Sequence, residues 1–235
     1  MDREQSTRQW YSRYYSQSGA DRNDLRTNRG VLFQTIAMEA SFVRAIGRVD
    51  HEAGAAKVLD VGCGGGGDIF QLTRVGYDPC NITGVDILEE HLDRARSLYP
   101  QVEFVHRDAS SMDFADGSFD LCFSSGMFAT LPDDKLSASI ASEMVRVCKP
   151  GGWLLIVDWW TPKPRDPNYK ALTKRRMREL FGVGSDTRVA GIHRGALIPP
   201  VGRFLSARLP ALYFLTAAVF PFTVGQVAYL LRKDG

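Results

Sequence analysis

The chain has 235 residues, of which 44% are hydrophobic and 24% are charged. This is the composition of a soluble globular domain and excludes disordered, collagen-like and disulfide-rich chains. Its four cysteines lack the paired spacing of a zinc site or a disulfide framework, so we expect a reducing compartment and no metal. The first residues, MDREQSTRQW, contain no apolar core segment, so no secretory signal is expected and the cytoplasm is the expected location.

The net charge of +2 is unevenly distributed along the chain. From Lys163 to the end there are 13 Lys or Arg residues against 4 Asp or Glu, a balance of +9 that leaves −7 for the rest. This excess indicates either a solvated surface or a face turned towards an anionic substrate or membrane.

The segment Leu209 to Leu231 holds no charged residue and is long enough to span a bilayer. Two prolines, a glycine and a glutamine interrupt it. We therefore expect a buried end of the domain, and we keep contact with the inner face of a membrane as the alternative.

Apolar patterns of strand and helix alternate along the chain. Helices are expected at 6–17, 28–49, 68–75, 88–99 and 134–148, and strands at 57–61, 81–87, 102–108, 119–125 and 152–160. After Thr161 the alternation weakens into a basic amphipathic helix at 168–182, an extended segment at 187–197 and a last strand at 223–233. Such alternation predicts an α/β fold, a mostly parallel seven-stranded sheet with helices on both faces.

Ligands of parallel sheets bind beyond the carboxyl ends of the strands, which directs attention to the stretch KVLDVGCGGGGD, residues 57–68. Five glycines occupy the six positions after Val61, so a ligand can approach bare backbone. The spacing Gly62-x-Gly64-x-x-Gly67 satisfies the dinucleotide fingerprint, but this pattern alone does not identify a nicotinamide dehydrogenase.

Carboxylates follow the first three expected strands. Asp60 ends the first strand, where it would suit a ligand with an ammonium or sulfonium group better than a pyrophosphate. Asp86 ends the second strand, placed to accept hydrogen bonds from ribose hydroxyls, and Asp108 follows the third, where it can accept one from an adenine amino group. Together these carboxylates describe a pocket for S-adenosylmethionine.

The stretches VLDVGCGGG, GVD, RDAS, FDLCFSS and CKPGGWLLIVD, in order from Lys57 to Asp158, resemble the class I S-adenosylmethionine-dependent methyltransferases of the small-molecule, type 11-like branch. The resemblance implies a Rossmann-like fold. It also implies glycine roles for Gly62, Gly64 and Gly66, with Gly65 and Gly67 open as turn formers. The expected cofactor-binding residues are Asp60, Gly62, Gly64, Gly66, Asp86, Ile87, Asp108, Ala109 and Ser124.

The expected organisation is an N-terminal helical lid at 1–50, a cofactor-binding core at 51–162 and a substrate-facing part of the same domain at 163–235. Because the cofactor carries its own leaving group, a base is needed only when the nucleophile must lose a proton. The candidates are His193 and Asp158, each with a packing or capping role as the alternative. Candidate substrate-binding residues are Tyr11, Tyr15, Trp159 and Arg175.

The predicted function is O-methylation of a small or carrier-linked acceptor, such as a sugar of a bacterial surface polysaccharide. The basic helix with Lys174, Arg175, Arg176 and Arg178 motivates this choice, since such clusters bind phosphate. A quinone or lipid-ring methyltransferase and a non-catalytic cofactor-binding module remain as alternatives. No nucleic-acid partner is expected, because the net charge is small and SSGMFATLPD differs from the Asn-Pro-Pro-Tyr type of base methylases.

Overall fold

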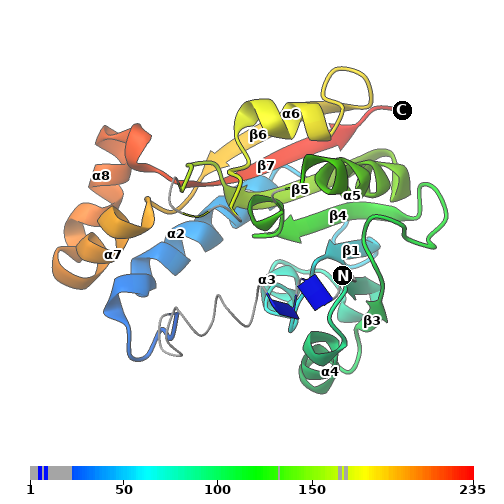
Figure 1. Cartoon of the computed structure of the whole chain (residues 1–235), viewed down its shortest axis with the longest axis horizontal. Coiled ribbons are helices and arrows are strands. Elements are labelled where there is room, and N and C mark those ends of the chain that lie inside the picture. Colours follow the sequence, from blue (N-terminus) through cyan, green and yellow to red (C-terminus); the bar gives the residue numbers. More distant parts are fainter. Residues whose placement is uncertain (1–4, 7, 10–22, 132, 164–165, 167–168) are drawn as a thin grey trace.

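The computed structural model describes the whole chain except residues 1–4, 7, 10–22, 132, 164–165 and 167–168. Seven strands form one sheet in the order β3-β2-β1-β4-β5-β7-β6, in which all pairs are parallel except the two that β7 makes (Figure 1). The strands are β1 (Val58–Val61), β2 (Ile82–Asp86), β3 (Glu103–His106), β4 (Phe119–Ser125), β5 (Cys148–Trp159), β6 (Thr187–Arg194) and β7 (Gln226–Lys233). The prediction of a mostly parallel, seven-stranded sheet is confirmed.

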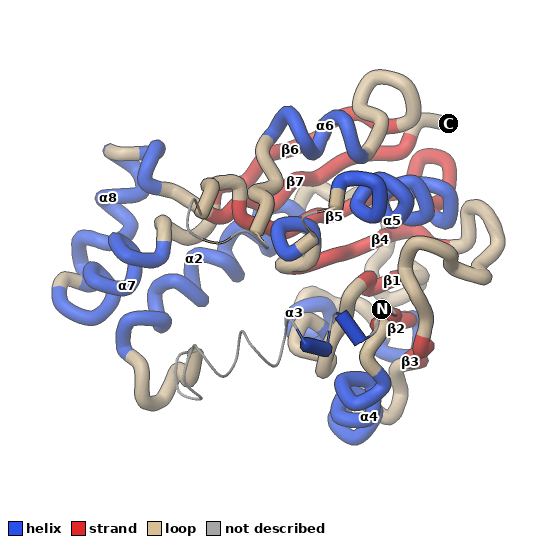
Figure 2. The backbone as a smooth tube through the Cα atoms, viewed as in Figure 1, coloured by secondary structure: helices blue, strands red, loops and turns tan. Residues whose placement is uncertain are grey.

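Loops of different lengths join the described helices to the strands (Figure 2). Several begin where the sequence supplies a capping side chain: Asn28 accepts the N–H of Gly30, and Asp133 accepts the N–H of Lys135. The helices are α2 (Arg29–Ile46), α3 (Ile69–Arg74), α4 (Glu89–Leu98), α5 (Asp134–Val147), α6 (Lys174–Leu180), α7 (Pro199–Arg208) and α8 (Tyr213–Val219). Short 3-10 turns are η1 (Pro79–Asn81), η2 (Phe128–Thr130), η3 (Pro210–Leu212) and η4 (Pro221–Thr223).

The core lies on both faces of the sheet. Side chains of α2, α3 and α4 pack on one face and those of α5 and α6 on the other. This explains why the strands read as continuous apolar runs: Val58 faces one layer and Leu59 the other, and both are fully buried.

The C-terminal apolar segment corrects one expectation. Its last part forms β7 and is buried, as expected, but the part that precedes β7 folds into η3, α8 and η4 and leaves large apolar side chains exposed. Among the described residues, no helix combines the length and the apolar character that crossing a membrane requires.

The N-terminal part lies in two places. Helix α2 packs against β6, β7 and α7, and its Glu39 pairs with Arg74 of α3 at 3.2 Å. Most of the expected helix at 6–17 lies outside the described residues, but Arg8 donates two hydrogen bonds of 2.8 Å to Glu90, near the start of α4. This ion pair holds the pKa of Glu90 down to about 2 and places Arg8 near the start of α4, which follows β2. The lid and the domain boundaries stay predictions.

Candidate active site

The loop after β1 needs glycine at alternate positions. Gly62, Gly64 and Gly66 have φ angles of 75°, 51° and 78°, which L side chains rarely adopt, whereas Gly65 and Gly67 have no positive φ. The three residues that the family pattern requires are therefore the three whose backbone demands glycine.

The space around each glycine shows which positions of the loop are packed against protein and which are open to a ligand. A Cβ at Gly62 would stand 2.8 Å from the sulfur of Met127, so this position is closed by the protein itself. A Cβ at Gly64 or Gly67 would meet no atom within 4 Å. The loop therefore exposes bare backbone to open space, where a ligand can approach it.

Asp60 lies beneath this loop at the end of β1. Its side chain is fully buried, and neither carboxylate oxygen has a hydrogen-bond partner among the described residues. Burial, followed by the nearby charges of Asp68 and Asp86, raises the pKa of Asp60 well above its usual range. A buried carboxylate without a partner is a costly arrangement, and a cationic ligand would relieve it.

Asp68 is the site residue that sequence reasoning missed, since it was assigned only to the start of a helix. Burial raises its pKa to about 6, and a hydrogen bond with Ser125 opposes this shift. With Asp60 and Asp86 it forms a cluster of carboxylates around one loop. Its place eight residues after Asp60, within the glycine stretch, was the available signal.

Asp86 and Asp108 are fixed by backbone contacts. The carboxylate of Asp86 accepts the N–H of Gly64 at 2.9 Å and that of Leu88 at 2.9 Å, so it ties the glycine loop to β2. Asp108 accepts the N–H and the hydroxyl of Ser110 at 2.9 and 2.8 Å. Because an ionised carboxylate has about four lone-pair positions, both residues retain acceptor capacity for a ligand.

The remaining predicted cofactor residues lie at the same edge of the sheet. Ile87 follows β2, and its carbonyl lies 2.9 Å from Nε2 of His106, while Ala109 follows β3 and packs on the second core layer. Ser124, near the end of β4, is buried, and its hydroxyl has no partner among the described residues. The structure thus gathers the predicted cofactor residues at the carboxyl ends of β1, β2, β3 and β4.

Asp158 has hydrogen-bond partners within the described chain. It is buried near the end of β5, and its carboxylate accepts the N–H of Trp159 at 2.7 Å and of Ala129 at 3.0 Å. Burial raises its pKa to about 6, against the effect of these hydrogen bonds. This geometry fits the capping alternative better than the role of a free base.

His193 lies far from the glycine loop. Three strands separate β6 from β1, which at about 4.8 Å per strand step is roughly 19 Å. Burial, followed by the charges of Arg44 and Arg48, lowers the pKa of His193, and its Nε2 has no partner among the described residues. The structure does not bring this predicted base to the cofactor residues.

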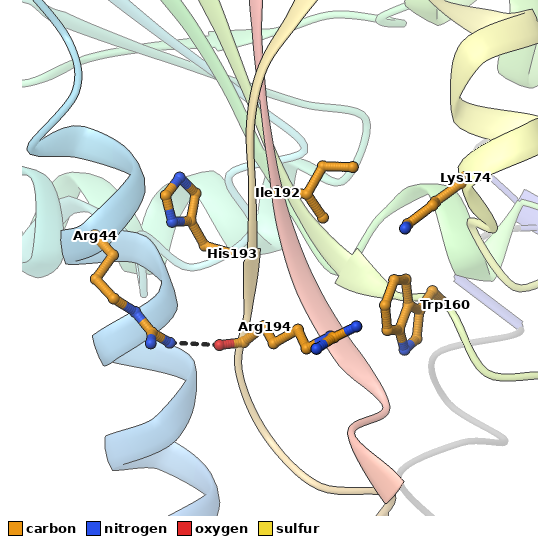
Figure 3. Close-up of a pocket in the computed structure, with 6 residues that line it drawn as sticks. All are labelled: Arg44, Trp160, Lys174, Ile192, His193 and Arg194. Atoms are coloured by element: carbon orange, nitrogen blue, oxygen red, sulfur yellow. Dashed lines mark hydrogen bonds between the residues drawn. The ribbon is translucent and has the colours of Figure 1, made fainter. Parts of the chain in front are cut away.

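His193 instead lines a pocket of about 330 Å³ at the edge of the sheet. Figure 3 shows it on the side of α2, beside Arg44, while Lys174 and Arg194 lie on the other side near the ring of Trp160. The Lys174 nitrogen lies 5.6 Å and the Arg194 guanidinium carbon 6.0 Å from the centre of that ring. Among the described residues neither cation has a carboxylate partner, so the pocket is positively charged.

The predicted substrate residues are dispersed. Trp159 packs half-buried against α2 and α7, and Arg175 is exposed and paired with Glu179 at 2.8 Å. Tyr11 and Tyr15 lie outside the described residues. Within the described part of the chain, no group of three or more His, Cys, Asp or Glu side chains is arranged to hold a metal ion.

The comparisons decide the family. Residues 58–152 match a family model described as a methyltransferase domain. These residues form a class I S-adenosylmethionine-dependent methyltransferase domain. A S-adenosylmethionine-dependent methyltransferase structure from Methanosarcina mazei has the same fold, with a TM-score of 0.59 at 20% identity over 80% of this chain and 96% of that one.

Curated relatives are similar over the same core. The 2-methyl-6-phytyl-1,4-hydroquinone methyltransferase of Synechocystis is 35% identical over 164 residues, 67% of this chain and 50% of its own. A sterol 24-C-methyltransferase of Neurospora crassa is 31% identical over 67% of this chain and 44% of its own. The present chain thus spans about half the length of these relatives.

The residues of this methyltransferase fit the family cofactor, S-adenosylmethionine. The carboxylate of Asp60 without a partner suits the cationic amino-acid end, and the open backbone at Gly64 leaves room for that end to approach. Asp86 and Asp108 can accept hydrogen bonds from the ribose and the adenine. When bound, this cofactor supplies a methyl group on a sulfonium that is its own leaving group.

Proposed function

We propose that this methyltransferase transfers the methyl group of S-adenosylmethionine to a small, largely apolar acceptor of the quinone or lipid-ring class. The observation that supports the cofactor is Asp60, which lies beneath an open glycine loop. It is a fully buried carboxylate whose oxygens have no partner among the described residues. Such a site is unfavourable unless a cation occupies it.

The chain's own residues then act by binding and orientation. The glycine loop, held to β2 by Asp86, fixes one end of the cofactor, and Asp108 is placed for the other. Orientation of two reactants is worth up to roughly 7–11 kcal/mol in well-aligned cases, so methyl transfer does not depend on a strong base unless the acceptor must lose a proton.

The apolar acceptor class is supported by the surface and by the relatives. Apolar side chains of the segment between β6 and β7 are exposed, and the similar proteins carry the names of phytyl-hydroquinone, sterol and tocopherol methyltransferases. The sugar acceptor expected from the sequence was motivated by the basic helix together with the apolar segment, and α6 presents fewer free cations than its sequence suggests. Arg176 points inward and bonds to backbone carbonyls, and Arg175 is already paired with Glu179.

A direct test measures cofactor binding and methyl transfer separately. Calorimetry with S-adenosylmethionine tests binding, and incubation with methyl-labelled cofactor tests transfer to a prenylated hydroquinone, a sterol and nucleotide sugars. We expect binding together with label in the hydroquinone or the sterol. Label in sugars alone would contradict the acceptor class, binding without any turnover would favour a non-catalytic module, and the absence of binding would end the proposal.

A further inference from the structure

The segment between β6 and β7, residues 195–225, concentrates the exposed apolar surface of this protein. Of the fifteen large hydrophobic side chains exposed in the described chain, eight lie between residues 204 and 222. The most exposed is Phe222, at 78%. We call these eight side chains the insertion face: Phe204, Leu209, Leu212, Phe214, Leu215, Val219, Phe220 and Phe222. Single exposed apolar residues are common, but a cluster of this kind marks an interaction site.

The insertion is a folded element rather than a loosely attached loop. Tyr213 of α8 is fully buried, and its hydroxyl bonds to Gln34 of α2 and to the backbone N–H of Leu197. Phe33 of α2 packs on Phe214 with ring centres 5.8 Å apart. The inner side of the insertion is therefore fixed to the domain, while the eight apolar side chains named above stay exposed. Figure 1 shows α7 and α8 beside one end of α2.

The insertion itself carries charge of one sign. From Gly195 to Gly225 the sequence contains no Asp or Glu, but it contains Arg203 and Arg208. Arg208, at the end of α7, is exposed directly before Leu209. Apolar side chains bordered by arginines without acids are the signature of an element that lies in the interface of an anionic membrane.

The positively charged pocket adjoins the same region. Trp160, which contacts Lys174 and Arg194, donates its indole N–H to the carbonyl of Val224 at 2.8 Å. Val224 directly follows η4, which carries Phe222. The two cations therefore lie beside the insertion face, where they would meet the phosphates of lipid headgroups.

We propose that the insertion face docks this protein on the surface of an anionic lipid bilayer. The apolar side chains enter the interface, while Arg208 and the pocket cations contact headgroup phosphates. The charge disfavours a second copy as the occupant, because a twofold contact through this face would place the same arginines opposite each other. The inference uses only exposed side chains and their charge, so it does not depend on the proposed function.

Flotation of the full chain with vesicles tests this inference without acceptor or cofactor. We expect binding to mixed phosphatidylcholine and phosphatidylglycerol vesicles, weaker binding to phosphatidylcholine alone, and a decline of the anionic component with added salt. The double variant with Leu215→Ser and Phe222→Ser should bind at least about tenfold less, since two large side chains lose their burial in the interface. Leu98→Ser is the matched control, because Leu98 is 55% exposed on α4, away from the insertion.

Each outcome has a defined meaning. Arg208→Gln should lower binding to anionic vesicles only, and Arg178→Gln on α6 should not. Failure of the parent to bind, or equal binding by the parent and the double variant, would overturn the inference. A dimer in light scattering that the double variant disperses would also overturn it, by assigning the face to a second copy. If the parent protein binds vesicles but transfers no methyl group to any acceptor, the proposed function is rejected and the membrane inference stands.

Discussion

Asp60 and Asp158 are both buried carboxylates near the carboxyl ends of their strands, β1 and β5, which β4 separates. Their hydrogen-bond partners nevertheless differ. Asp158 accepts two backbone N–H groups, so the protein offsets part of the cost of its burial. Asp60 has no described partner, and two other carboxylates raise its pKa further. The first arrangement stabilises the fold, whereas the second stores unfavourable free energy that a cationic ligand can release.

Asp60→Asn is therefore expected to stabilise the ligand-free protein and to weaken cofactor binding at least about tenfold. Because the pKa of Asp60 is higher in the folded than in the unfolded chain, its contribution to stability is largest at low pH and falls as the pH rises above about 4. The gain from Asn, about 1 kcal/mol or more per pKa unit removed, should thus appear at pH 7–8 and vanish near pH 4. Urea unfolding across this range and calorimetry with S-adenosylmethionine measure both effects.

Asp158→Asn is the matched control for that experiment. Its single side-chain oxygen leaves one of the two N–H groups without an acceptor, so we expect a loss of about 1–3 kcal/mol in the free energy of unfolding. Cofactor affinity should stay unchanged. A shift of stability in the same direction for both variants would contradict the distinction between the two carboxylates.

At the scale of elements, the positions of the core strands could be predicted from the sequence, because strands covered on both faces form continuous apolar runs. The pattern predicted a strand at 119–125, and β4 spans those residues; the other six strands lie in or overlap their predicted ranges. Burial within the insertion could not be predicted in the same way, because a run of apolar residues does not indicate which side of a short helix packs on the domain. Tyr213 is buried and Phe214 is exposed one residue later.

The basic helix α6 shows the same limit for the site. The four basic residues of this helix suggested a surface that binds phosphate. The role of each one depends on whether its side chain points into the protein or towards solvent. Arg176 reaches Asp134, Ser137 and backbone carbonyls of η2 and its flanking loops, whereas the Arg175 side chain is 88% exposed. The position of Asp60 was predictable, because it depends on a strand end and a loop that the sequence itself marks.

Arg176→Met should consequently destabilise the protein by about 3 kcal/mol or more, because several buried acceptors lose their donor at once. Arg175→Met removes only an exposed ion pair and should change the free energy of unfolding by about 0.5 kcal/mol or less. Urea unfolding of the two variants compares them directly. Similar losses would show that α6 is not anchored through Arg176.

The whole molecule separates its charges along the chain. Residues before Lys163 carry −7 and include the carboxylate cluster of the glycine loop, whereas the remainder carries +9 and includes the acid-free insertion. A cationic cofactor and an anionic surface would thus be attracted to different parts of one domain. The two predicted attractions are independent, since the carboxylates belong to the loops after β1 and β2 and the arginines to the far edge of the sheet.

Cofactor binding should also be coupled to proton release. In the empty site, burial and the neighbouring acids favour the protonated form of Asp60, and a cation beside it favours the ionised form. S-adenosylmethionine should therefore bind more tightly as the pH rises, and the number of protons released should grow as the pH is lowered from about 8 to about 5. Calorimetry in two buffers with different ionisation enthalpies measures that number. Asp60→Asn should remove most of the release, while Asp158→Asn should retain it. Equal binding heats in both buffers for the parent would show that Asp60 does not change its protonation state on binding and that its raised pKa plays no part in it.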